Sequence, residues 1–182
     1  MQVSERVNPL KDWQSYKMAS QERRLYSQQI GYAGEYATAS ELLFRGITTE
    51  VNNIDAGIDL VCWLKGRTKQ IQVKTRNENP ERPNLFIYDI RKSSFSIPDY
   101  FIFVARRLDN RNYFVILPRS LIHRFADTGV VSQPRSGYYR VTLRYGNNKV
   151  WIRNKKNDIT PYLNNWVIWP MREYFIIVLI YN

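Results

Sequence analysis

The stretch GIDLVCWLKGRTKQIQVKT, residues 57–75, predicts a β-hairpin with one polar and one apolar face. Apolar and polar side chains alternate through both halves, and the halves are separated by a turn centred on Gly66 and Arg67. With that turn, Asp59 lies opposite Lys74 in an antiparallel pair. The hairpin therefore brings a carboxylate and an ammonium group together across two strands.

The faces of this hairpin follow from the alternation of side chains along a strand. Asp59, Gln72 and Lys74 share one face. The opposite face takes the apolar residues Leu60, Cys62, Ile71 and Val73. A register slip of two residues leaves this division unchanged, whereas a slip of one residue reverses it.

The polar face has an ordinary explanation and a chemical one. A simple ion pair between Asp59 and Lys74 on an exposed sheet is common. Three features favour a metal site instead: Gln72 adds a neutral oxygen ligand, Glu35 lies on a predicted helix just before the hairpin, and the whole chain is basic. Mg²⁺ prefers hard oxygen ligands, and metal-assisted phosphodiester hydrolysis needs no histidine and no nucleophilic side chain. Lys74 is then placed to stabilise developing phosphate charge.

Three short motifs in this order, Gly34-Glu35, Gly57-Ile58-Asp59-Leu60 and Gln72-Val73-Lys74, resemble the PD-(D/E)XK nuclease superfamily. The Gln-x-Lys variant is similar to that of the group I intron homing endonucleases of this superfamily. The same order also resembles the archaeal Holliday-junction resolvases. The resemblance covers about residues 29–76, and more loosely the hydrophobic pattern as far as residue 126.

The resemblance implies an α/β fold with a restriction-endonuclease-like core, in which helices flank a mixed β-sheet, here with an added basic β-hairpin. It implies that Glu35 and Asp59 are metal-linked carboxylates and that Lys74 is the catalytic lysine. Gln72 stands in the position that is usually acidic, which is the departure from the family pattern. The implied cofactor is Mg²⁺, for which Mn²⁺ can substitute.

The order of elements along the chain also predicts an α/β domain with a mixed sheet. We expect an N-terminal extension over 1–20, a catalytic core over 21–126, and a basic hairpin with a C-terminal strand over 127–182. The lead-in breaks at Pro9 in this interpretation. The expected elements are a helix over 21–45, strands over 47–51, 85–90, 100–105 and 113–117, and helices over 118–126 and 161–169.

Charge predicts the partner. The 182 residues hold 27 Lys and Arg against 16 Asp and Glu, a net charge of +11, which favours a polyanion, although a generically basic protein has the same balance. The single cysteine, Cys62, rules out an intrachain disulfide and a cysteine zinc cage, and it predicts a reducing, intracellular compartment. The expected localisation is cytoplasmic and nucleoid-associated. The apolar tail 174–181 is far shorter than the ~20 residues of a membrane span, so no membrane partner is expected.

A long acid-free run predicts the DNA-binding surface. No Asp or Glu occurs from Thr128 to Asn157, where a second hairpin turns at 146–148. A two-stranded basic ribbon, 135–156, fits a major groove or follows phosphates, although a solvated edge hairpin is also often basic. The predicted DNA contacts are Arg135, Arg140, Arg144, Lys149, Arg153, Lys155 and Lys156.

The sequence thus predicts a Mg²⁺-dependent DNA endonuclease, preferably of a homing or mobile-element type. A restriction enzyme, a junction resolvase, an RNA-processing nuclease and a non-catalytic DNA-binding protein remain alternatives. Cutting both strands of a duplex requires two active sites, which favours a homodimer or a higher homo-oligomer. The tail 174–181 is a candidate interface. The lone histidine, His123, is interpreted as structural, because no nucleophile motif accompanies it.

Overall fold

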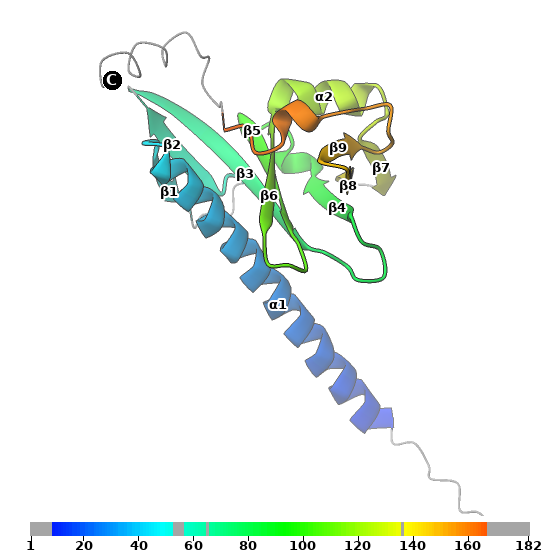
Figure 1. Ribbon diagram of the computed structural model, residues 1–182. Helices are drawn as coiled ribbons and strands as arrows, with labels where there is room; N and C mark the ends of the chain where they lie inside the picture. The colour runs from blue at the N-terminus through cyan, green and yellow to red at the C-terminus, as the bar shows by residue number, and fades with distance from the viewer. Residues whose placement is uncertain (1–8, 53–56, 65, 136, 167–182) are drawn as a thin grey trace, which may run out of the picture.

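The computed structural model describes residues 9–52, 57–64, 66–135 and 137–166 (Figure 1). A long helix, α1 (Pro9–Phe44), runs along one side of the molecule and extends well beyond it. The remaining elements are β1 (Thr48–Val51), β2 (Leu60–Leu64), β3 (Arg67–Asn77), β4 (Leu85–Arg91), η1 (Lys92–Ser94), β5 (Tyr100–Arg106), β6 (Asn112–Pro118), α2 (Arg119–Asp127), β7 (Ser132–Arg135), β8 (Tyr138–Gly146), β9 (Lys149–Ile152) and η2 (Thr160–Tyr162).

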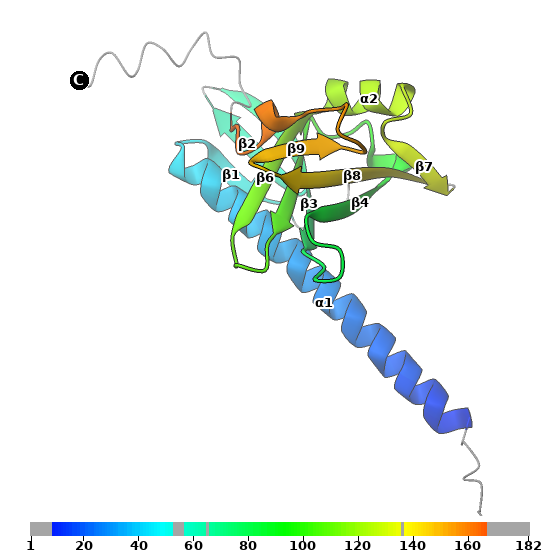
Figure 2. The same cartoon turned by 45° about the vertical axis from the view of Figure 1, so that its right-hand side comes forward.

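The strands form two sheets, and the first is mixed as predicted. Its order is β1-β2-β3-β5-β6, with β3 and β5 parallel and the other neighbours antiparallel. The second sheet has the order β4-β8-β7, and β9 pairs with β8 (Figure 2). The predicted basic hairpin is therefore present as β8 and β9, but it is built into a sheet instead of standing alone.

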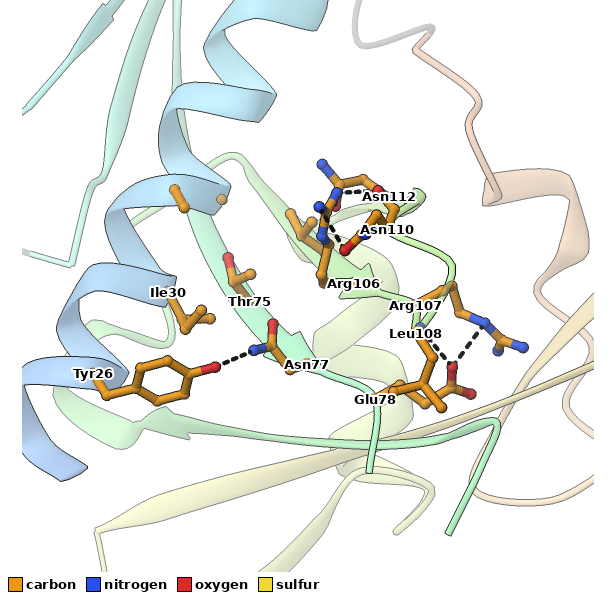
Figure 3. Close-up of a pocket in the computed structure, with 13 residues that line it drawn as sticks. Tyr26, Ile30, Thr75, Asn77, Glu78, Arg106, Arg107, Leu108, Asn110 and Asn112 are labelled. Atoms are coloured by element: carbon orange, nitrogen blue, oxygen red, sulfur yellow. Dashed lines mark hydrogen bonds and ion pairs between the residues drawn. The ribbon is translucent and has the colours of Figure 1, made fainter. Parts of the chain in front are cut away.

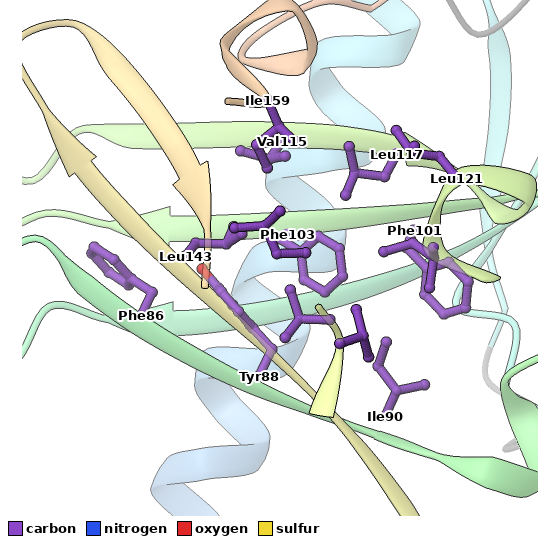
Figure 4. Close-up of a cluster of buried hydrophobic side chains, with 14 of the residues drawn as sticks. Phe86, Tyr88, Ile90, Phe101, Phe103, Val115, Leu117, Leu121, Leu143 and Ile159 are labelled. Carbon is purple, nitrogen blue, oxygen red and sulfur yellow. The ribbon is translucent and has the colours of Figure 1, made fainter. Parts of the chain in front are cut away.

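Two apolar clusters define three layers. The larger lies between the two sheets, where Phe101 and Phe103 of β5 meet Tyr88 of β4 and Leu143 of β8 (Figure 4). The smaller lies under α1, on the opposite face of the first sheet, and includes Leu42, Leu60, Cys62, Ile71, Val73 and Val104. Strands β5 and β6 are buried on both faces, in keeping with their continuous apolar sequences. No helix among the described residues is both long and apolar enough to cross a membrane.

The central hairpin has the predicted faces, but the predicted register is wrong by two residues. Leu60 pairs with Ile71 and Leu64 pairs with Arg67, so only residues 65 and 66 connect the strands. Gly66 has a φ of +75°, which suits the tight two-residue turn that hairpin twist favours. Continued outward, this register places Asp59 level with Gln72 and not with Lys74.

Helix α1 is longer at its N-terminal end than predicted. Pro9 is the first helical residue, where its fixed φ and missing N–H cost nothing, so the helix includes residues 9–20 of the expected extension. The residues before Pro9, which a break there would separate from the helix, lie outside those that the structure describes. The predicted end is confirmed: Gly46, with a φ of +73°, follows the last turn. Only a 3₁₀ turn, η2, occupies the described part of the helix expected over 161–169, and the expected strand over 174–181 lies outside the described residues.

The crossing of α1 over β3 depends on Gly34. A Cβ atom at this position would lie 1.7 Å from Oγ1 and 2.8 Å from Cβ of Thr75, so only glycine permits the observed approach. The neighbouring residues of this contact are Glu35 on the helix and Lys74 on the strand. The close approach thus brings a carboxylate of one layer to the strand that carries the lysine.

Gly34 and Gly31 provide a matched pair of alanine substitutions. Gly34→Ala should destabilise the protein by about 2 kcal/mol, because the helix and Thr75 must separate. Gly31→Ala meets nothing within 4 Å and should stabilise the helix by about 0.5–1 kcal/mol. Urea unfolding of the two variants and the wild type measures both values. Similar stability changes of one sign would contradict this account of the crossing.

Candidate active site

Three of the four predicted site residues line one cavity of about 500 Å³. Asp59, Gln72 and Lys74 enter it from the polar face of the β2–β3 hairpin, between the two sheets. The remaining lining residues are Gly57, Asp89, Arg91, Ser93, Ser94, Ile97 and Tyr138. The polar face predicted from strand alternation is therefore a cavity wall.

Hydrogen bonds hold Asp59 at the end of the hairpin. Its Oδ2 accepts a hydrogen bond from the Val73 amide at 2.6 Å, and its own amide donates to the Ile71 carbonyl at 2.9 Å. The side chain of Asn52 donates to the carbonyl of Ile58, the residue before Asp59, at 3.0 Å and so anchors this segment. The carboxylate is thus oriented by the backbone of β3.

Gln72 is buried, with 3 % of its surface exposed, and its amide has a defined orientation. Its Nε2 donates to the Gly57 carbonyl at 3.1 Å, which identifies the NH₂ end. Its Oε1 is buried and has no hydrogen-bond partner among the described residues. Leaving such an oxygen unpaired costs about 1–3 kcal/mol, so this atom is suited to a ligand.

The Gly57 backbone has a conformation that only glycine adopts easily. Its φ is +76°, and a Cβ atom would lie 2.3 Å from Cβ of Ser94. This contact packs the loop before β2 against η1, which follows β4. The Gly57 carbonyl, which orients Gln72, is therefore held where the loop before β2 packs against η1.

Glu35 reaches the site from α1. It does not line the cavity, but burial raises its pKa from 4.5 to about 7, and the Asp59 carboxylate adds to this rise. The Lys74 ammonium acts in the opposite direction. The structure thus places Glu35 within electrostatic range of both residues, as its predicted role requires.

The raised pKa of Glu35 predicts a pH-dependent cost to stability in the metal-free protein. A carboxyl group whose pKa is higher in the folded than in the unfolded state destabilises the fold as it ionises, between pH 4.5 and 7. After allowance for its partial exposure, Glu35→Gln should be about 1 kcal/mol more stable than the wild type at pH 8 in chelator, and equally stable near pH 4. Glu22→Gln, at an exposed position of the same helix, is the control. Equal differences at both pH values for Glu35→Gln would contradict the shift.

The donor set is compatible with a divalent metal. Two carboxylates, on Glu35 and Asp59, and the unpaired Oε1 of Gln72 are hard oxygen donors of the kind that Mg²⁺ prefers. Within the part of the chain that the structure describes, no three His, Cys, Asp or Glu side chains gather into a metal-binding group. The third donor at this site would be the neutral amide.

Sequence reasoning missed the second wall of the cavity. Asp89 and Arg91 of β4, Ser93 and Ser94 of η1, and Tyr138 of β8 come from elements that no motif connects to the hairpin. Only Tyr138 lies in a segment that the sequence singles out, the predicted basic ribbon 135–156. The wall forms because the second sheet packs on the same face as Lys74.

The predicted DNA-binding residues lie on several elements. Arg135 belongs to β7, Arg140 and Arg144 to β8, and Lys149 to β9, while Arg153, Lys155 and Lys156 follow β9. The turn at Asn147 and Asn148, with φ values of +49° and +58°, confirms the predicted hairpin position.

Part of this basic set already has a partner among the described residues. Arg140 makes a bidentate pair with Asp89, at 2.8 and 3.0 Å, next to the cavity. Lys149 lies 4.0 Å from Asp158, and Arg153 donates to the Gly129 carbonyl. The side chains of Arg144, Lys155 and Lys156 are exposed. Tyr139 and Tyr145 of β8 are partly buried, and their rings pack against Phe95 and Phe86.

A larger cavity, of about 750 Å³, lies between α1 and the ends of β3, β5 and β6 (Figure 3). Two polar contacts lie inside it: Asn77 donates to Tyr26 at 3.0 Å, and Arg107 pairs with Glu78 at 3.3 Å. The buried Oγ1 of Thr75, which also lines this cavity, has no hydrogen-bond partner among the described residues. None of the four predicted site residues lines it. Size alone therefore does not identify the candidate site.

The other two groups considered from the sequence are structural. The His123 ring stacks on Phe95, with 4.7 Å between ring centroids, and lies outside the site cavity, as the structural interpretation requires. Cys62 is buried in the cluster under α1, and burial raises the pKa of its thiol to about 11.

Comparisons with known proteins support the fold. No family model matches the chain, and no curated protein is similar to it in sequence. The structure is similar to that of a bacterial homing endonuclease, I-Ssp6803I, with a TM-score of 0.53 and 18 % identity over 76 % of this chain and 87 % of that one. A Holliday-junction resolvase, Hjc of Archaeoglobus fulgidus, matches at a TM-score of 0.40 and 12 % identity, over 60 % of this chain and 81 % of that one. The likeness to I-Ssp6803I confirms the predicted fold.

Proposed function

We propose that this chain, which has the fold of a bacterial homing endonuclease, is a divalent-metal-dependent DNA endonuclease that hydrolyses phosphodiester bonds. One observation supports this most: Asp59, Gln72 and Lys74 share a cavity on a nuclease fold, with Glu35 in electrostatic range. We further propose Mg²⁺, replaceable by Mn²⁺, as the cofactor and a sequence-specific homing or mobile-element role.

The proposed chemistry divides the four residues into two roles. Glu35, Asp59 and the Oε1 of Gln72 would hold the metal, which, when bound, neutralises phosphate charge and lowers the pKa of a water molecule. Lys74 faces the same cavity and would stabilise the negative charge that develops on the phosphate. The Val73 amide keeps the Asp59 carboxylate oriented. The Gly57 carbonyl binds the NH₂ group of Gln72, so the Gln72 oxygen points away from this carbonyl.

The direct test is a cleavage assay on supercoiled, linear and four-way-junction DNA, each with Mg²⁺, Mn²⁺ or EDTA. We expect cutting with either metal and none in EDTA. The preferred substrate separates the homing-type assignment from a junction resolvase, and matched RNA substrates test for an RNA nuclease. Cutting that persists in EDTA would contradict the proposal.

Gln72 favours a second candidate function, a DNA-binding protein without cleavage. A neutral amide in the usually acidic position leaves two carboxylates for a metal. This candidate predicts tight DNA binding in EDTA and no cutting with either metal on any substrate, including a library of random sequences.

Three exposed basic residues of this set provide a test of DNA binding. Replacing Arg144, Lys155 and Lys156 by alanine should weaken binding in EDTA and lower the slope of log affinity against log salt by about 2–3, because each lost phosphate contact removes about 0.9. Fluorescence anisotropy over a salt series measures the slope. The control replaces three exposed arginines elsewhere, Arg24, Arg82 and Arg111, and removes the same charge. Equal slopes in the two variants would show that net charge, not this surface, binds DNA.

A further inference from the structure

Helix α1 carries a stripe of large side chains on the surface of the described structure. They are 51, 55, 61 and 53 % exposed, in the order Leu25, Tyr32, Tyr36 and Leu43. Their spacing of seven, four and seven residues places them within about 20° of one line along a helix that turns about 100° per residue. Gly34 and Thr38, which are buried against the first sheet, lie on the opposite side of the helix. The four residues are called the Leu-Tyr stripe below.

The Leu-Tyr stripe is symmetric about position 34. Leu25 and Leu43 are each nine residues from this position, and Tyr32 and Tyr36 are each two residues from it. Suppose that two such helices pack antiparallel with a two-fold axis at position 34. Leu25 of one helix then faces Leu43 of the other, and Tyr32 of one faces Tyr36 of the other. An isologous interface uses the same surface on both subunits, so the order of residues must read the same in both directions, as it does here.

The charge around the Leu-Tyr stripe also suits a second copy of this chain. Although the protein has a net charge of +11, no Lys or Arg occurs from Leu25 to Phe44. The exposed neighbours of the stripe include Gln28, Gln29 and Ser40, which are neutral. Two strongly basic chains repel each other, so they associate most easily through a surface without cations. The same lack of cations makes this helix face a poor surface for DNA.

We propose that the Leu-Tyr stripe is the homodimer interface, formed by two antiparallel α1 helices related by a two-fold axis at position 34. The proposal rests on the proposed function for its purpose, since a duplex cut on both strands needs two active sites. Glu35 is one residue from the axis position on each helix. The packing of the two helices would therefore set the distance between the two active sites. The 18 residues from Leu25 to Leu43 give a contact about 27 Å long.

Cysteine cross-linking tests the interface and its register. In the antiparallel pair, residue 25 of one chain faces residue 43 of the other, whereas the two copies of residue 25 are about 27 Å apart. Leu25→Cys and Leu43→Cys should therefore not form disulfide dimers alone, but a mixture of the two variants should. The native Cys62 is buried and its pKa is raised to about 11, so it should remain unreactive.

Size-exclusion chromatography with light scattering gives the second readout. The wild type should be a dimer or a higher even-numbered assembly, and Tyr32→Lys with Tyr36→Lys should weaken self-association at least 100-fold. Phe44→Lys is the control, because Phe44 is 87 % exposed and lies about 100° around the helix from Leu43.

A monomeric wild type, disulfide dimers of either single cysteine variant, or a dimer without the 25–43 cross-link would overturn the proposal. Circular dichroism verifies that each variant is folded. The assays contain neither DNA nor metal, so their outcome is separate from that of the nuclease proposal.

Discussion

Lys74→Ala is expected to reduce the rate of metal-dependent DNA cleavage by about 1,000-fold, while DNA affinity in EDTA changes less than about threefold. The lysine lies in the cavity with Asp59 and Gln72, where it would act on charge that develops during the reaction and not on the bound ground state. Single-turnover cleavage with saturating Mg²⁺ measures the rate, and anisotropy measures the affinity.

Lys69→Ala is the matched control for Lys74. Both lysines are on β3, but Lys69 lies 3.7 Å from Asp99, away from the cavity. The control variant should cleave DNA at close to the wild-type rate. If Lys74→Ala cleaved as fast as Lys69→Ala, Lys74 would have no part in the chemistry. An equal loss of DNA affinity and rate in Lys74→Ala would instead make it a binding residue.

Asp59→Asn should lower cleavage by about 1,000-fold at fixed Mg²⁺ and raise the Mg²⁺ concentration for half-maximal rate at least about tenfold. Asparagine keeps the shape of the side chain and an oxygen that accepts from the Val73 amide, so the fold should be retained. The substitution therefore removes charge without removing the hydrogen bond. Cleavage rates over a Mg²⁺ titration, together with the melting temperature, separate these effects.

Asp99→Asn is the control for Asp59. Asp99 also accepts a hydrogen bond from an amide of β3, that of Gln70 at 3.0 Å, but it does not line the cavity. The two variants should have similar stability and very different Mg²⁺ dependence. Unchanged turnover of Asp59→Asn at low Mg²⁺ would remove Asp59 from the metal site.

Strand alternation was enough to predict which residues of the hairpin act together. Side chains two residues apart share a face whatever the turn, so the grouping of Asp59, Gln72 and Lys74 followed from the sequence. The exact register did not, because the turn contains two residues, where a longer one was expected. The error of two residues kept the faces and moved every cross-strand partner by two positions, so that Asp59 is level with Gln72.

The surroundings of the hairpin depended on contacts between distant segments. Neither the pairing of Arg140 with Asp89 nor the contact of Ser94 with Gly57 has a local pattern that predicts it. The first requires β4 to pair with β8 inside the second sheet, and the second requires η1, which follows β4, to pack against the loop before β2. The prediction that Arg140 binds DNA rested on charge alone, and charge does not reveal whether a side chain already has a partner.

The sequence by itself determined the helix end at Gly46, the buried strands and the polar face of the hairpin, because each depends on residues within a few positions of one another. Only the tertiary structure brought Glu35 within electrostatic range of Asp59 and Lys74. That outcome requires α1 to cross β3 at Gly34 and Thr75, which are 41 residues apart, and it is set by the space that a missing side chain leaves. Local periodicity specifies faces, whereas close packing between layers specifies which faces meet.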